Sequence, residues 1–273
     1  MSHATSGAYR LSGGVENIVE LREGEFEDRV EHEWYSPRID RKELKKLMQR
    51  SDIEGWKHFG SWLALLAGSA AGAFLTWGTW WCIPFFALYG LMYSMSDHHA
   101  HELWHGTPFR TRWFNELFHH LNGFMTLHEG YAWRWSHTRH HTETLIVGRD
   151  PEIAAPRPPD IRGLLLDLFY IKSAYIQLKK IGANAIGFFD NDTRDFVPES
   201  ELGKVALSSR IYITVILAML AACVYWQTIL PALFVVTPRI YGGPMAQIFN
   251  ITQHAGLAEN VRDHRLNTRT VIF

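Results

Sequence analysis

The stretch that decides the fold is residues 56–96, WKHFGSWLALLAGSAAGAFLTWGTWWCIPFFALYGLMYSMS, in which Lys57 is the only Asp, Glu, Lys or Arg. A helix needs about 20 residues to cross the hydrocarbon core of a bilayer, and this run is about twice that long. Gly78 lies near its middle among three tryptophans, a residue type that gathers at membrane interfaces. The run therefore predicts two membrane-spanning helices, at about residues 56–75 and 80–98, joined by a tight turn near Gly78.

A second apolar run extends over residues 211–251 and is interrupted near residues 225–227. It is long enough for two further spans, at about residues 208–226 and 228–250. Proline and glycine in the later half predict that the fourth span is kinked or irregular. Arg239 lies within this span, so we expect it to snorkel to the interface or to face protein or a water-filled cavity.

Basic residues predict the orientation of these spans. The two tight turns contain no Lys or Arg, whereas six basic residues lie between residues 38 and 50, directly before the first span: Arg38, Arg41, Lys42, Lys45, Lys46 and Arg50. The positive-inside rule then places the N-terminus, the central polar region and the C-terminus in the cytosol. We expect a multi-pass membrane protein with its polar chemistry on the cytosolic face.

The remaining segments predict smaller elements. Residues 1–33 are polar and predict a flexible tail, so the membrane domain comprises residues 34–273. Residues 41–50 place Leu44, Leu47 and Met48 on one helical face, which fits either a helix on a membrane surface or an ordinary solvated helix. Ser51 followed by Glu54 predicts a capping box, and residues 161–181 predict one surface helix.

The overall composition excludes other classes of protein. Hydrophobic residues make up 47% of the 273 residues while the mean hydropathy is only -0.12, because charge is separated from the apolar runs. The net charge of -1 gives no field that favours nucleic acid. Cys82 and Cys223 each lie within an apolar run, which favours packing over a disulfide.

Histidine carries the chemistry of this chain. Ten of the 15 histidines lie between residues 98 and 141. His101 and His105 in HELWH are one helical turn apart, and the histidines of HTRHH at residues 137–141 stand at i, i+3 and i+4, so each set shares one helix face. Neutral imidazole is the commonest metal ligand in proteins and suits iron as well as zinc. The two motifs together predict a metal centre at the cytosolic end of the spans.

A third element follows the fourth span. Asn250 and His254 in NITQH are again one turn apart, which favours a further ligand at the same membrane surface. Asp97 and Glu102 are candidates to support the ligands, with solvated charges as the equal alternative. Five other histidines are expected to be interfacial or hydrogen-bonded rather than ligands: His98, His99, His119, His120 and His128.

The segments HELWHGTPF, WSHTRHH and QHAGL, framed by two apolar hairpins, resemble the membrane-bound fatty acid desaturase and hydroxylase superfamily. The segment DHRLNTRT at residues 263–270 is similar to a bacterial branch that includes dihydrorhizobitoxine desaturase and the hydrocarbon oxygenase of rhizopine catabolism. The resemblance implies an all-α membrane protein with four transmembrane helices in two hairpins and a cytosolic helical cap that carries the metal site.

The same resemblance implies a set of ligands for two iron ions. His101 and His105 match the first histidine box, His137, His140 and His141 match the second, His254 matches an extra ligand and Asn250 a group that reaches the metal through water. The third HxxHH box of the family would lie beyond Phe273, so six family ligands are present and three are not. The implied reaction is O2-dependent desaturation or hydroxylation of a lipid-like substrate. Electrons would come from a separate ferredoxin and its reductase, and this ferredoxin could be of the Rieske type.

Two other functions fit some of these residues. HELWH also matches the HExxH helix of zinc proteases, in which the glutamate is the general base, so a membrane-embedded zinc hydrolase is one alternative. That class needs a third ligand, typically an Asp of a later span, and the second apolar run contains none. The other alternative is a truncated desaturase-like membrane protein without activity.

Overall fold

The computed structural model describes residues 35–153 and 157–269, and within these ranges the chain forms helices and no strand. The flexible tail predicted for residues 1–33 lies outside the described residues. The chain divides into two compact units. Of the described residues, the box-two unit contains 35–39, 135–153, 157–165 and 248–269, and the helix-packing unit contains Asp40–Arg134 and Leu166–Gln247.

The helices follow one another along the chain in this order: α2 (Arg41–Leu47), α3 (Asp52–Leu75), α4 (Cys82–Ser94), α5 (Ser96–Trp104), α6 (Arg112–Met125), α7 (Gly130–Thr142), α8 (Ile161–Leu168), α9 (Ile171–Ala185), α10 (Asn191–Phe196), α11 (Glu199–Tyr225), the π-helix η1 (Ala232–Val236), α12 (Pro238–His254) and α13 (His264–Asn267).

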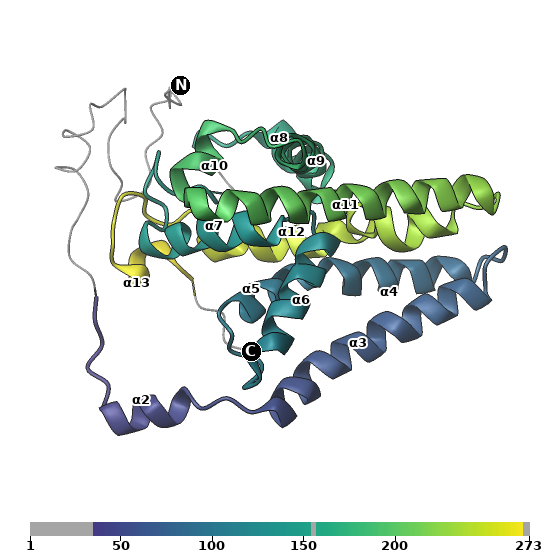
Figure 1. Ribbon diagram of the computed structural model, residues 1–273. Coiled ribbons are helices and arrows are strands. Elements are labelled where there is room, and N and C mark those ends of the chain that lie inside the picture. The colour runs from purple at the N-terminus through teal and green to yellow at the C-terminus, as the bar shows by residue number, and fades with distance from the viewer. Residues whose placement is uncertain (1–34, 154–156, 270–273) are drawn as a thin grey trace. The chain divides into compact units, whose positions relative to one another are not determined.

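The first predicted hairpin is formed by α3 and α4, which pack along each other and meet at a turn near Gly78 (Figure 1). Ser51 caps α3 by accepting a hydrogen bond from the Glu54 N–H, which confirms one half of the expected capping box. Only Met95 separates α4 from α5, and its φ of -67° and ψ of -12° keep the right-handed helical conformation. Residues 82–104 are therefore helical almost throughout.

The second predicted hairpin is formed by α11 and the irregular segment that follows it. The π-helix η1 begins after Pro231, contacts α11, and ends at Thr237 before α12 starts with Pro238. The expectation of an irregular fourth segment is confirmed at this point. The turns of the two hairpins lie on the same side of the helix-packing unit, at the right of Figure 1.

Within the part of the chain that the structure describes, two helices, α3 and α11, are long and apolar enough to cross a membrane. Only 22% and 17% of their most apolar windows are buried within the protein, whereas the core helix of a soluble protein is mostly buried. Large apolar side chains on both helices are exposed, including Leu65, Phe74, Leu217 and Val224. Nonpolar surface of this kind is suited to a lipid environment.

The core of the helix-packing unit is aromatic. Phe59 and Trp62 of α3 pack with Tyr89 and Tyr93 of α4, and the indole Nε1–H of Trp62 donates to the backbone oxygen of Met92 over 2.8 Å. Glycine permits the closest helix approach: a Cβ on Gly242 would lie only 1.8 Å from the backbone oxygen of Gly90. The helices α4 and α12 are therefore in backbone contact.

Arg239 faces protein, which is one of the three environments expected for it. It is only 3% exposed, and it donates to the backbone oxygen of Ser94 over 2.6 Å and to Oδ2 of Asp97 over 3.1 Å. Its guanidinium also lies over the ring of Tyr170, 4.7 Å from the centroid. A buried charge is tolerated because it is paired and hydrogen-bonded in this way.

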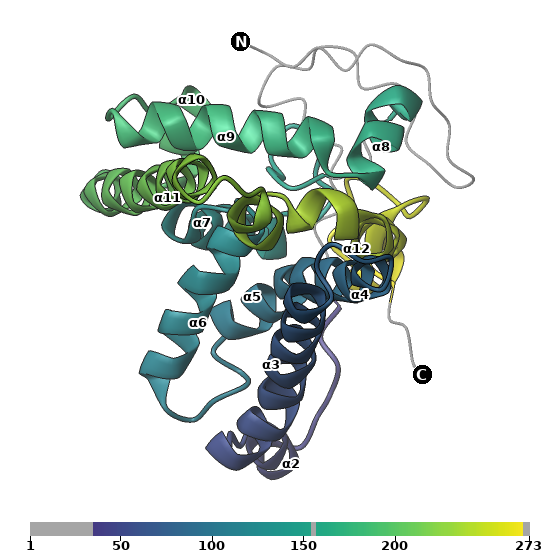
Figure 2. The same ribbon diagram turned by 90° about the vertical axis from the view of Figure 1, so that its right-hand side faces the viewer.

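The prediction of one helix over residues 161–181 is wrong, because α8 and α9 are separate helices (Figure 2). Tyr170 stands between them with a φ of 55°, in the left-handed region that breaks a helix. Its hydroxyl donates to the backbone oxygen of Thr126 over 2.7 Å. This nonlocal hydrogen bond and the contact with Arg239 stabilise the break.

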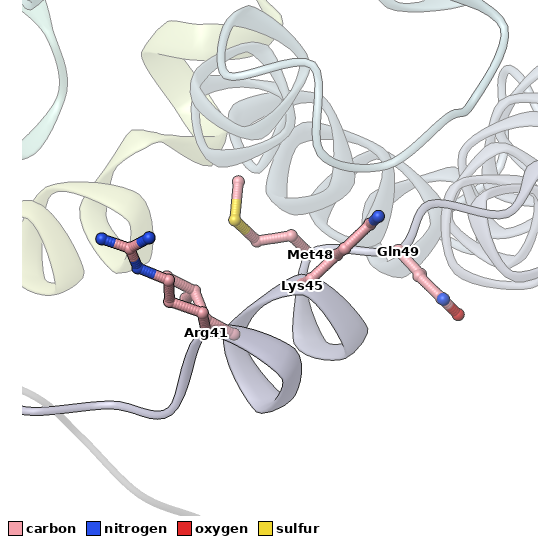
Figure 3. A pocket seen from close by; sticks show the side chains of 5 residues that line it. Arg41, Lys45, Met48 and Gln49 are labelled. Atoms are coloured by element: carbon pink, nitrogen blue, oxygen red, sulfur yellow. The ribbon is translucent and has the colours of Figure 1, made fainter.

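The amphipathic helix expected near residues 41–50 is α2, which Asp40 caps through hydrogen bonds from the N–H groups of Lys42 and Glu43. None of its residues is buried. An open hollow on its surface is lined by the following five residues (Figure 3): Arg41, Leu44, Lys45, Met48 and Gln49.

Candidate metal centre

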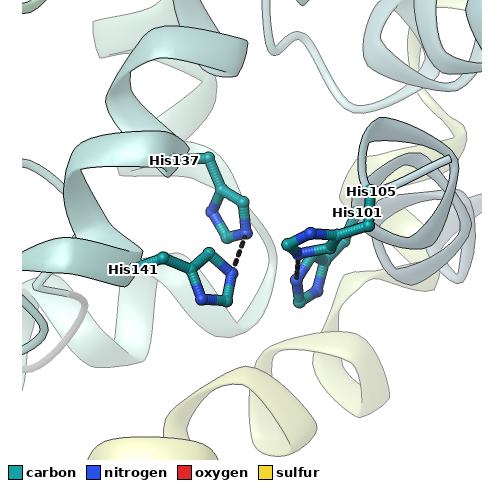
Figure 4. Close-up of side chains that lie close together, drawn as sticks. All are labelled: His101, His105, His137 and His141. Atoms are coloured by element: carbon teal, nitrogen blue, oxygen red, sulfur yellow. Dashed lines mark hydrogen bonds between the residues drawn. The ribbon is translucent and has the colours of Figure 1, made fainter. Parts of the chain in front are cut away.

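The first histidine box lies at the end of α5. His101 is in the last turn of the helix and His105 is its C-terminal cap, so the two imidazoles leave the same face. Their Nε2 atoms are 3.0 Å apart (Figure 4). A metal with imidazole bonds of about 2.1 Å and an angle of 90° between them separates the two nitrogens by about 3.0 Å. This pair is thus spaced as two ligands of one ion would be.

The second box has the same spacing on another helix. His137 and His141 of α7 place their Nε2 atoms 3.0 Å apart (Figure 4). His137 is 6% exposed, and its Nδ1 donates to Oε2 of Glu152 over 2.7 Å. Glu152 also accepts a hydrogen bond from Oγ of Ser136 over 2.6 Å. The ring of His137 is therefore fixed from the side opposite to its Nε2.

His140 is fixed by a second carboxylate. Its Nδ1 lies 2.9 and 3.0 Å from the two oxygens of Asp150, which also accepts from the N–H groups of Leu145 and Glu152 over 2.8 Å each. Burial alone would lower the pKa of His140, but the hydrogen bond and charge of Asp150 outweigh it and raise the pKa. Burial would likewise raise the pKa of Glu152, and its hydrogen bond with His137 lowers it. These shifts are typical of carboxylate–histidine pairs.

Sequence reasoning missed both of these carboxylates. Asp150 and Glu152 belong to the loop after α7, in the sequence Arg149-Asp150-Pro151-Glu152. Two carboxylates within 12 residues of a histidine box are a usable signal, because histidine ligands commonly donate their second N–H to such groups. Asp97 and Glu102, which from the sequence are equal candidates for supporting the ligands or for being solvated charges, form ion-pair contacts with Arg239 and His58.

His254 is a further predicted ligand in the box-two unit. Its Nδ1 donates to the backbone oxygen of Asn267 over 2.9 Å, and its ring lies 5.2 Å from that of His140, almost perpendicular to it. Asn267 is 1% exposed and is held by donating to the backbone oxygens of Thr144 and Val261. Burial lowers the pKa of His254, which favours the neutral imidazole. Asn250 lies one turn earlier on α12 and is half-buried.

Comparison with known proteins identifies the family. The family model for fatty acid desaturase matches residues 78–272, which is well over half of the chain and includes the seven predicted metal-site residues. The chain belongs to the fatty acid desaturase family. No curated protein matches it. Desaturases of this family are membrane-bound oxidoreductases of lipid metabolism that usually use iron.

The histidines of the box-two unit have the chemistry that an iron site needs. A backbone oxygen and an ionised carboxylate only accept hydrogen bonds, so His137, His140 and His254 must each donate from Nδ1. In a neutral imidazole, the lone pair is then on Nε2, where a metal can bind it. Metal-bound histidines in proteins show this arrangement almost without exception. The donor set therefore fits the metal that desaturases use.

The other residues considered from the sequence have different contacts. His119 is fully buried, with Nδ1 3.1 Å from the backbone oxygen of Ala100 and Nε2 3.0 Å from that of Gly130, so both nitrogens have protein partners. Asp97 pairs with Arg239. Glu102 lies 3.3 Å from Nε2 of His58. His119 thus follows the expectation of a structural histidine.

Proposed function

We propose that this chain is an O2-dependent di-iron oxidoreductase that desaturates or hydroxylates a fatty acyl chain or another lipid-like substrate. Its iron ligands would be the histidines of the two boxes and of α12, with Asn250 reaching a metal through water: His101, His105, His137, His140, His141 and His254. Iron supplies the oxidising power for an unactivated C–H bond, which side-chain acid–base chemistry cannot provide.

One observation carries this proposal: three histidines from two helices of the box-two unit present Nε2 because a carboxylate or carbonyl holds Nδ1. Asp150 and Glu152 would fix the ring orientations and raise the basicity of the two imidazoles. Asn267 would do the same for His254 through its backbone oxygen. In these roles the three residues position ligands and do not contact substrate.

We extend the proposal to the membrane arrangement. The helix-packing unit would cross the bilayer four times, with α3 and α11 as full spans and with about residues 80–98 of the α4–α5 helix and about residues 228–250, which include η1, as the other two. Trp77, Trp80 and Trp81 are exposed at the first turn, as interfacial anchors would be. The basic residues before α3 support an orientation in which the histidine boxes would lie on the cytosolic face of a bacterial inner membrane.

The helix α2 would lie on the same membrane surface. Its apolar residues Leu44, Leu47 and Met48 are between 41% and 69% exposed, although water is an unfavourable environment for them. Cations surround this face, and anionic headgroups would attract them. The lipid-like substrate would enter from the membrane. Electrons would come from the cytosol, from a separate ferredoxin and its reductase, and this ferredoxin could be of the Rieske type.

The position of Glu102 argues against the zinc hydrolase. In an HExxH protease this glutamate acts as general base on the metal-bound water. Here its Oε2 atom lies 3.3 Å from Nε2 of His58 and 3.9 Å from Nδ1 of His99. The carboxylate is thus engaged on α3, away from the role that a hydrolase requires.

The reaction is tested by supplying the purified, iron-loaded protein with reduced ferredoxin, 18O2 and a deuterated acyl lipid. Loss of two deuterium or hydrogen atoms from the acyl chain would identify desaturation, and incorporation of one 18O atom would identify hydroxylation. Neither product should form with the His141→Ala variant. Hydrolysis of the lipid or of a peptide without consumption of O2 would contradict the proposal. His264→Ala, an exposed histidine outside the boxes, is the matched control and should retain activity.

A further inference from the structure

A second group of potential metal ligands lies within the helix-packing unit. It consists of His58 on α3 and of His99 and Glu102 on α5, none of which is among the ligands proposed above. One ligand atom from each residue lies within 4.8 Å of the others. His99 and Glu102 stand at i and i+3 and therefore share a helix face, and that face is directed toward α3.

The distances suit one small ion. Oε2 of Glu102 is 3.3 Å from Nε2 of His58 and 3.9 Å from Nδ1 of His99. Zinc bonds of about 2.0–2.2 Å in tetrahedral geometry separate the ligand atoms by about 3.4 Å. Small rotations of the two exposed side chains would bring all three atoms to that spacing, because His58 and Glu102 have side-chain exposures of 61% and 46%.

His99 supplies the observation that an ion pair cannot explain. An ion pair between His58 and Glu102 accounts for those two residues, but Nδ1 of His99 is buried and has no hydrogen-bond partner. The residue is only 8% exposed, and its ring is held 4.6 Å from that of Trp62 and 5.5 Å from that of Phe59. A buried polar nitrogen without a partner is costly, and a metal ion would satisfy it.

We propose that His58, His99 and Glu102 bind one divalent transition-metal ion, with zinc as the best fit. Two imidazoles and one carboxylate form a known zinc ligand set, and solvent would supply the fourth ligand on the exposed side. The ion would join α3 to α5, the helix that carries the first histidine box. It is separate from the two irons, because it uses none of their ligands.

Zinc binding to the intact, iron-loaded protein in detergent tests the proposal. The protein is equilibrated with zinc ion alone, freed of excess metal, and its zinc and iron contents are measured together for four forms: wild type, His58→Gln, Glu102→Gln and Lys57→Gln. Lys57 is the matched control, because it neighbours His58 and has a similarly exposed side chain at 67%. Helical content by circular dichroism checks that each form is folded.

Wild type and Lys57→Gln should each retain one more zinc per chain than His58→Gln and Glu102→Gln. The dissociation constant for zinc should rise at least about tenfold in His58→Gln and in Glu102→Gln. Iron content in His58→Gln should equal that of wild type. Equal zinc in all four forms would overturn the proposal, as would a loss of zinc in Lys57→Gln. Since two exposed residues are changed independently, unfolding of one variant leaves the other as the test.

Discussion

The two compact units of this protein are stabilised by different means. In the box-two unit, hydrogen bonds fix the important side chains: Asp150, Glu152 and the backbone of Asn267 each hold one histidine. In the helix-packing unit, aromatic contacts and a glycine–glycine approach between α4 and α12 determine the structure. The first arrangement orients ligands, and the second brings apolar helices together.

Because different contacts stabilise the two units, we expect metal affinity and protein stability to respond to different substitutions. Polar changes in the box-two unit should weaken metal binding while leaving the fold of the helices unchanged. Packing changes in the helix-packing unit should lower the free energy of unfolding first. Arg239 is an exception, because it forms a buried ion pair with Asp97 within the otherwise apolar helix-packing unit.

Arg239→Met should have the largest effect on stability. It leaves Asp97 buried without its cation, and breaking a buried ion pair costs about 3–5 kcal/mol. Thermal unfolding in detergent measures this loss. The control is Arg265→Met, the same substitution in the pair Arg265–Asp263, where the arginine side chain is 61% exposed and little change is expected. Equal shifts in both variants would contradict the role of burial.

Gly242→Ala should have the next largest effect on stability. Its Cβ would meet the backbone of Gly90, so α4 and α12 must separate, at a cost of about 1–3 kcal/mol. Gly203→Ala on α11 is the matched control, because a Cβ there meets nothing within 4 Å. Alanine should stabilise that helix by up to about 1 kcal/mol. A stability loss in Gly203→Ala similar to that in Gly242→Ala would show that the close helix approach is not the cause.

Asp150→Asn should weaken iron binding by about 10- to 100-fold, because the substituted amide no longer orients and polarises His140 as a carboxylate does. Asparagine has the same size but only one acceptor oxygen, so one of the two backbone N–H groups that Asp150 accepts from loses its partner, and the free energy of unfolding should also fall by about 1–3 kcal/mol. Competition with a chelator measures the affinity. Glu143→Gln is the control, since Glu143 pairs with Arg139 and Arg149 rather than with a histidine. Normal iron affinity in Asp150→Asn would remove the positioning role.

Asn260→Ala should have the smallest effect, a decrease of about 1 kcal/mol in the free energy of unfolding. Its side-chain oxygen accepts from the N–H of Val147 over 2.9 Å, and its φ of 58° is in the left-handed region. Asn260→Gly separates the two causes, because glycine loses the hydrogen bond but adopts this φ without strain. Limited proteolysis of the box-two unit is the measurement. Greater protease resistance in either variant would be the unexpected result.

Local patterns in the sequence predicted the features that depend on near neighbours. The spacing in HELWH and HTRHH places the histidine pairs on shared helix faces, as α5 and α7 show, and Ser51 caps α3 as expected. Gly78 and the tryptophans around it located the first turn. These predictions needed only helix geometry and residue preference.

Features that depend on contacts distant in the sequence were not predictable in this way. The left-handed Tyr170 that divides α8 from α9 depends on Thr126 and Arg239, which lie far away along the chain. Asn267 holds His254 across 13 residues and packs onto the loop after α7. No local pattern distinguishes such residues from other polar residues of a loop, because their role arises only when the chain has folded.

The iron content of the purified protein, measured for wild type and His140→Ala, is the decisive test of the proposed di-iron site. We expect about two irons per wild-type chain and a large loss of iron in the variant, because His140 presents Nε2 from a ring that Asp150 holds. A wild-type protein without iron would refute the di-iron site, as would iron content unchanged in His140→Ala. Zinc in place of iron, lost in the same variant, would point to the hydrolase instead.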